Sequence, residues 1–101
     1  GSDDFINVFD IAVRMYPTDE TANLNAAAVA LSKKDLGNAR KYLDKSDKQT
    51  AEYANNNGIY YLLNGETEQA IAEFGKAAQK GNEAAQYNLR EIEKVVKMKR
   101  E

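Results

Sequence analysis

Cysteine and histidine are both missing from the sequence, and proline occurs only once. Without cysteine the chain has no disulfide and no thiolate metal site, so oxidising and reducing compartments suit it equally. Without histidine it lacks the commonest general base and the commonest ligand of transition metals. We therefore expect neither an enzyme nor a protein that binds a metal or another cofactor.

Excess charge and long apolar runs are missing as well. Acidic and basic residues nearly cancel, leaving a formal charge of −2, which favours neither nucleic acid nor an anionic membrane as a partner. The longest apolar run covers residues 26–31, whereas a helix that spans a bilayer needs about 20 such residues. We therefore expect no nucleic acid as a partner, and no segment is expected to cross a membrane.

Helix-forming residues such as alanine, glutamate, lysine and leucine are abundant, and no segment alternates apolar and polar residues as a strand would. Capping and stop signals divide the chain into six expected helices, near residues 5–16, 19–33, 36–45, 47–64, 67–80 and 83–99. Asp35 is expected to cap the third helix, and Ser46 with Gln49 to form a capping box before the fourth. Gly65 should end the fourth helix in the left-handed conformation. The fold should therefore be all-α. Because the connections are short, neighbouring helices should form antiparallel hairpins.

The sequence also repeats itself at intervals of 31 to 34 residues. Small and apolar residues recur in this way, as Phe9 and Ala12, then Leu43 and Ser46, then Phe74 and Ala77. Asparagine recurs at Asn25, Asn56 and Asn88. Such spacing is typical of a solenoid, in which each helical hairpin packs on the next.

Residues 51–82 resemble a tetratricopeptide repeat. They carry the small and aromatic positions of that family in the right order and spacing, as Gly58, Tyr61, Ala70, Phe74 and Ala77. The resemblance implies that Gly58 and Ala70 let the two helices of the repeat approach closely. It also implies that Tyr61 and Phe74 fill the space between hairpins.

The resemblance covers residues 3–101 as a single domain, a tetratricopeptide-type solenoid of about six helices. Residues 20–50 match a repeat more weakly, residues 4–17 resemble the second helix of a partial repeat, and residues 83–99 resemble a first helix or a terminal capping helix. Residues 1–2 are interpreted as a scar of tag removal. Since residues 4–17 would be a second helix without its first, we expect the natural protein to continue before Asp3.

The resemblance implies a protein- or peptide-binding scaffold that uses the concave groove of the solenoid. In this family, asparagines at the position of Asn25, Asn56 and Asn88 face the groove and hold an extended peptide by its backbone, since asparagine offers a donor and an acceptor. The alternative is that these amides bond to the neighbouring helix. Further groove positions are implied at Leu24, Ala28, Leu31, Asn55, Ile59, Leu62, Leu63, Tyr87 and Glu91.

A second function stays open, namely a structural spacer or homo-oligomerisation element that associates through the open N-terminal edge of the stack. The sequence is also similar in style to repeat tails found beside OmpA-like peptidoglycan-binding domains in bacterial outer-membrane proteins. That similarity leaves both the cytoplasm and the periplasmic side of the outer membrane as compartments. The partner is not specified by either resemblance.

Overall fold

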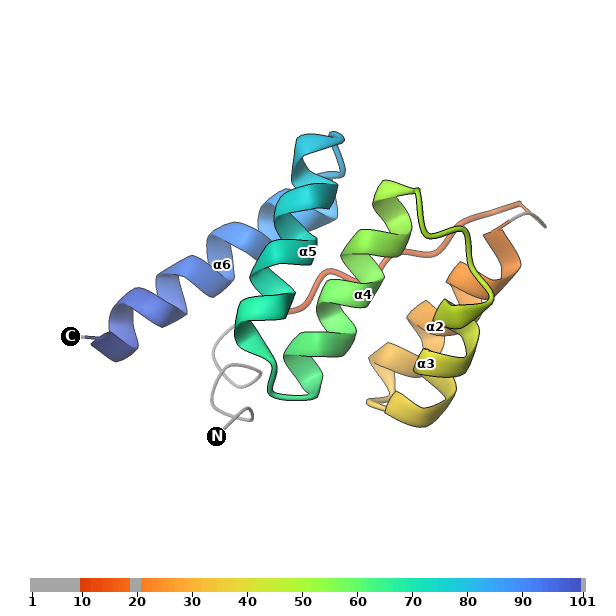
Figure 1. The fold of residues 1–101 in the computed structure, drawn as a ribbon, viewed down its shortest axis with the longest axis horizontal. Helices are drawn as coiled ribbons and strands as arrows, with labels where there is room; N and C mark the ends of the chain where they lie inside the picture. Colours follow the sequence, from red (N-terminus) through yellow and green to blue (C-terminus); the bar gives the residue numbers. More distant parts are fainter. Residues whose placement is uncertain (1–9, 19–20, 101) are drawn as a thin grey trace.

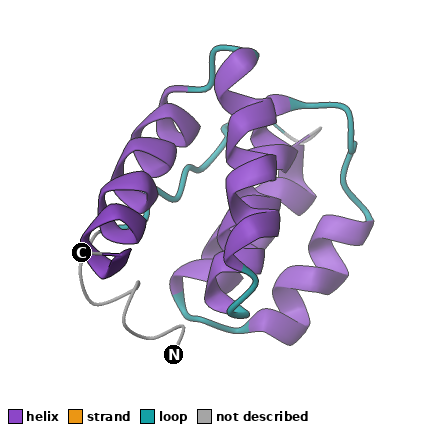
Figure 2. Ribbon diagram, turned by 60° about the vertical axis from the view of Figure 1, so that its left-hand side comes forward, coloured by secondary structure: helices purple, strands orange, loops and turns teal. Residues whose placement is uncertain are grey.

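The computed structural model describes residues 10–18 and 21–100, and this part of the chain is all-α, as predicted. Five helices joined by short loops occur in it, and no strand is present among the described residues (Figure 2). The helices are α2 (Ala22–Ser32), α3 (Leu36–Asp44), α4 (Ala51–Leu63), α5 (Thr67–Gln79) and α6 (Glu83–Arg100).

Consecutive helices pack side by side and antiparallel (Figure 1). α2 packs on α3, α4 on α5 and α5 on α6, while α4 also contacts α2 and α3. The molecule is elongated, measuring 45 × 27 × 18 Å, and the helices follow one another along its long axis. This arrangement is consistent with a helical bundle or a helical repeat.

The core between α4 and α5 is built around Phe74, which is fully buried. α4 approaches the ring closely because Gly58 has no side chain: a Cβ at this position would lie 2.7 Å from the Phe74 Cδ1 atom. Ala70 of α5 is also fully buried, and Tyr61 packs against the same cluster. The close approach of the two helices that Gly58 and Ala70 predicted is therefore confirmed.

Several expected helix ends are confirmed. Asp35 caps α3 by accepting a hydrogen bond from the Asn38 N–H, at 3.2 Å. Gly65 and Gly81 follow α4 and α5 with positive φ angles of 81° and 89°. This left-handed conformation lets the main chain close the last helical turn, and glycine adopts it without a Cβ clash.

The start of α4 differs from the prediction. Thr50 caps the helix, and its Oγ1 accepts a hydrogen bond from the Tyr53 N–H at 3.1 Å. The capping box predicted at Ser46 is wrong, because this residue lies two positions after the end of α3 and bonds back to that helix. Its N–H bonds to the Leu43 carbonyl, and its hydroxyl donates to the Tyr42 carbonyl.

The helix expected over residues 4–17 is not present in residues 10–17, which have no helical structure, and residues 4–9 lie outside the described part. We call residues 10–18 the N-terminal segment. It passes behind α4 in Figure 1 and ends near the start of α2. Ile11 and Val13 pack against the core cluster. The physical reason for the difference is that this backbone finds hydrogen-bond partners in asparagine side chains instead of its own preceding turn.

Candidate functional site

Two asparagines hold the middle of the N-terminal segment. Asn88 of α6 binds both backbone groups of Ala12: its Oδ1 accepts from the Ala12 N–H at 3.0 Å, and its Nδ2 donates to the Ala12 carbonyl at 3.4 Å. Asn55 of α4 donates to the same carbonyl, at 3.5 Å. The Asn88 Nδ2 also donates to the Asn55 Oδ1 at 3.1 Å, so the two amides orient one another. Both asparagine side chains are fully buried.

A third asparagine holds the end of the segment. Asn25 of α2 accepts from the Tyr16 N–H through Oδ1 and donates to the Tyr16 carbonyl through Nδ2. This is the same two-bond arrangement that Asn88 makes with Ala12, four residues earlier. An extended chain covers about 13 Å over four residues, so the two contacts fix the course of the segment from α6 to α2.

We call Asn25, Asn55 and Asn88 the asparagine face. Each of the three comes from a different helix, α2, α4 and α6, and each bonds only to main-chain atoms or to another member of the set. An amide that donates and accepts matches a peptide group, which also donates and accepts. The asparagine face thus holds the N-terminal segment through hydrogen bonds to its main chain.

One of the three asparagines predicted from the repeat spacing lies elsewhere. Asn56, which the repeat spacing placed with Asn25 and Asn88, instead donates to the Leu24 carbonyl of α2 at 3.3 Å. Successive residues on a helix are rotated by about 100°, so Asn55 points to the segment while Asn56 points to the neighbouring helix. Spacings of 31 and 32 residues suggested Asn56; the contact across the site joins Asn55 and Asn88, 33 residues apart.

The remaining predicted groove residues divide into two groups. Four of them are buried with the N-terminal segment in place, namely Leu24, Ala28, Ile59 and Leu62. Tyr87 is half-buried on α6, and Glu91 forms an ion pair with Lys94 at 2.8 Å.

Leu31 and Leu63 do meet the N-terminal segment. They lie at the carboxyl ends of α2 and α4 and line a cleft of about 360 Å³ together with Ile11 and Val13. The cleft gives the site an apolar part beside its amide part.

Tyr16 lies in a desolvated position at the end of the segment. Burial, aided by the negative charge of Glu52, raises the pKa of Tyr16 to about 12, although Arg14 and Asn82 oppose the shift. The hydroxyl is buried near the Asn82 side chain, but no hydrogen bond of normal geometry reaches it from the described residues. Its ring packs against a small cluster formed by α2, α3 and α4. The neutral phenol is therefore the form that fits this site.

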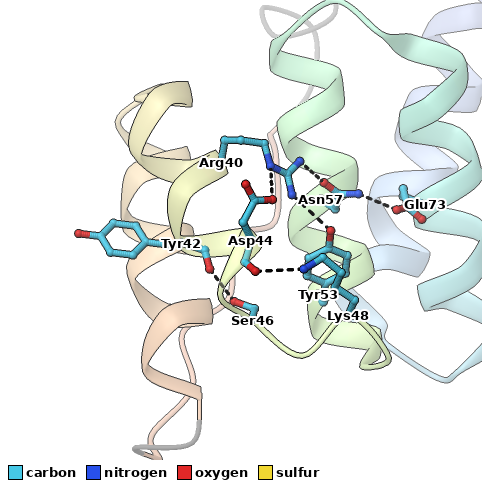
Figure 3. Close-up of polar contacts among 8 residues, drawn as sticks. All are labelled: Arg40, Tyr42, Asp44, Ser46, Lys48, Tyr53, Asn57 and Glu73. Atoms are coloured by element: carbon cyan, nitrogen blue, oxygen red, sulfur yellow. Dashed lines mark hydrogen bonds and ion pairs between the residues drawn. The ribbon is translucent and has the colours of Figure 1, made fainter.

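A second polar cluster ties α3, α4 and α5 together (Figure 3). Arg40 of α3 donates to Asp44 at 3.0 Å, to the Asn57 Oδ1 at 3.0 Å and to the Tyr53 hydroxyl at 3.3 Å. Asn57 then donates to Glu73 of α5 at 2.6 Å. Asn57 is rotated by about 200° from Asn55 around α4, so this cluster lies on the other side of that helix and takes no part in the asparagine face.

Within the described residues no helix is long and apolar enough to cross a membrane, and no group of three or more acidic side chains is placed to hold a metal ion. Comparison with protein-family models finds no match for the chain, and searches of curated proteins and of solved structures find no similar protein.

Proposed function

We propose that this domain is a tetratricopeptide-type helical scaffold that binds the backbone of an extended peptide on its asparagine face. The observation that carries the proposal is the pair of two-bond contacts that Asn88 and Asn25 make with the backbone of Ala12 and Tyr16. The bound segment is part of the same chain, but its hydrogen bonds to Asn88 and Asn25 use only its main-chain atoms. Another extended peptide can offer the same groups.

The chemistry of the site also suggests what kind of peptide it takes. Main-chain recognition tolerates many sequences, while the cleft beside Leu31 and Leu63 favours an aliphatic side chain near the first contact. The N-terminal segment occupies the site as an intramolecular ligand. A peptide that binds in trans must therefore compete with a tethered segment at high effective concentration.

A binding experiment with a weakened tethered segment tests the proposal. Ala12→Pro removes the N–H that Asn88 accepts, so a labelled, end-blocked peptide copy of residues 10–17 should bind this full-length variant more tightly than the natural chain. Adding Asn25→Ala should lower its affinity about 5- to 150-fold, the effect of losing two neutral hydrogen bonds of about 0.5–1.5 kcal/mol each. Asn23→Ala, the same change on the same helix outside the asparagine face, should leave the affinity unchanged.

Two further peptides separate backbone recognition from other kinds of binding. A scrambled peptide should keep most of the affinity, and a peptide N-methylated at the residues equivalent to Ala12 and Tyr16 should lose it. If the N-methylated peptide bound as well as its parent, recognition would not pass through the backbone. If no peptide bound and Asn25→Ala only lowered the melting temperature, the asparagines would be structural, as a spacer requires.

A further inference from the structure

The peptide bond between Arg14 and Met15 lies in an open part of the N-terminal segment. Both side chains are exposed, and Met15 keeps 57% of its surface accessible to solvent. The N–H groups of Val13, Arg14 and Met15 have no hydrogen-bond partner among the described residues, and residues 10–17 form no helix, strand or turn. Exposed stretches of this kind are the preferred sites of proteolytic cleavage.

The other arginines of the chain lie on helices. Arg40 belongs to α3 and donates three hydrogen bonds to neighbouring side chains. Arg90 lies in the middle of α6, and Arg100 at its end is followed only by Glu101. A protease that binds its substrate as extended chain must first unfold a helix to reach Arg40 or Arg90, which costs the free energy of local unfolding. At Arg14 no helix has to open.

The same bond lies between the two anchors of the segment. Ala12, which Asn88 holds, precedes it, and Tyr16, which Asn25 holds, follows it. Hydrolysis would therefore leave one anchored residue on each of the two products. Because a single chain now carries both contacts, each keeps the other at high effective concentration, and that advantage is lost when the chain is cut.

We propose that the Arg14–Met15 bond is a cleavage site for an arginine-specific protease, and that cleavage opens the asparagine face. The exposed guanidinium can pair with a carboxylate in the specificity pocket of such an enzyme. Water adds across the bond: the C–N bond breaks, Arg14 gains a carboxylate and Met15 an ammonium group. The piece that ends at Arg14 then has no covalent link to the helices and dissociates on dilution. Only the use of the opened face by another peptide rests on the function proposed above.

Limited digestion of the folded chain with an arginine-specific protease tests the site. We expect one internal cut, giving residues 1–14 and 15–101 by mass spectrometry, and further cuts at Arg40 and Arg90 only after urea has unfolded the helices. Arg14→Lys keeps the charge but is not a substrate of this enzyme, so it should show no internal cut in native buffer. Cleavage of the natural chain at Arg40 or Arg90 as fast as at Arg14 would overturn the proposal.

Gel filtration of the diluted digest tests the opening of the site. Residues 1–14 should elute apart from residues 15–101. The labelled, end-blocked peptide copy of residues 10–17 should then bind the larger product about 100-fold more tightly than the intact chain, the lower end of the effect of tethering. Arg14→Lys treated with the same protease should gain no affinity.

Three outcomes separate this proposal from the function proposed above. Co-elution of the two products would overturn the opening of the site. Their separation without a gain in peptide affinity would also overturn it, provided that Ala12→Pro does bind the peptide more tightly. Separation of the products, with no peptide bound by either the larger product or Ala12→Pro, would support release of the segment and refute peptide binding by the asparagine face.

Discussion

Single residues of this chain differ in how well their backbone conformation suits them. Each of α2, α4 and α5 is followed by a residue of positive φ, which is Lys34, Gly65 and Gly81 respectively. In each case the next N–H bonds back into the last turn of the helix, as Asp35 does to the Ala30 carbonyl at 2.8 Å. The three ends are therefore one motif, and only Lys34, at φ 59°, bears the Cβ that disfavours it.

Lys34→Gly should stabilise the protein. Glycine removes the left-handed strain, which is about 1–2 kcal/mol, but loses part of this to the greater freedom of the unfolded chain. We expect a net gain of about 0.5–1 kcal/mol in the free energy of unfolding, measured by urea denaturation. Lys33→Gly, one residue earlier where φ is −93°, is the control and should destabilise. A loss of stability with Lys34→Gly would show that the side chain contributes more than its conformation costs.

The contact of Gly58 with Phe74 predicts that Gly58→Ala destabilises the natural chain but stabilises the Phe74→Ala variant. Phe74→Ala should cost about 3–5 kcal/mol, because the ring is fully buried. Gly58→Ala alone should also destabilise, since a Cβ would lie 2.7 Å from the ring. In the Phe74→Ala background the clash is gone, so the same change should stabilise by up to about 1 kcal/mol, the difference in helix propensity. Equal effects of Gly58→Ala in the two backgrounds would mean that α4 and α5 do not meet here.

At the scale of elements, the helices were predictable because their signals are local. Asp35, Gly65 and Gly81 mark helix ends within a few residues of sequence, and α3 to α6 follow them. The N-terminal segment was not predictable in this way. Its apolar spacing indicates a helix, but a short helix depends on tertiary cover, and the amides that bind its backbone come from α2, α4 and α6.

The candidate site was partly predictable for a related reason. Repeat spacing predicted Asn25 and Asn88 as groove positions, and in the structure both bond to the N-terminal segment. It could not choose between Asn55 and Asn56, because one residue of uncertainty in the spacing rotates the side chain by about 100°. Only the packed structure shows that Asn55 meets Asn88 while Asn56 bonds to Leu24.

The N-terminal segment should respond to high pH through Tyr16. Its pKa is raised to about 12 by burial and by Glu52, so the folded state favours the neutral phenol. Its stabilising effect is complete below about pH 10, the pKa of an unfolded tyrosine, and is lost as the pH rises from about 10 towards 12. From pH 8 to pH 11, the melting temperature of the natural chain should therefore fall further than that of Tyr16→Phe.

The same variant gives a second result at neutral pH. Since the Tyr16 hydroxyl is buried without a partner among the described residues, its removal should not lower the melting temperature and should raise it slightly. A clearly lower melting temperature of Tyr16→Phe at pH 8 would indicate that the hydroxyl is hydrogen-bonded. An equal fall of the melting temperature of both proteins by pH 11 would show that other groups cause the loss.

At the scale of the whole molecule, the two polar clusters lie on opposite sides of α4 and make different contacts. Arg40 and Asn57 join α3, α4 and α5 into one body on one side (Figure 3). On the other side, Asn55 and Asn88 use their amides on the backbone of an extended segment. The first cluster holds α3, α4 and α5 together and so supports the asparagine face, which we propose as the binding surface.

Amide hydrogen exchange of residues 12–16 tests that central claim most directly. The N–H groups of Ala12 and Tyr16 donate to Asn88 and Asn25, whereas those of Val13, Arg14 and Met15 have no partner among the described residues. We predict slow exchange at the first and last of the five residues and fast exchange at the three between them, with Asn25→Ala releasing Tyr16. Two results would contradict binding of this backbone by Asn88 and Asn25. One is uniform protection of all five residues, as in a stable helix; the other is no protection at Ala12 and Tyr16.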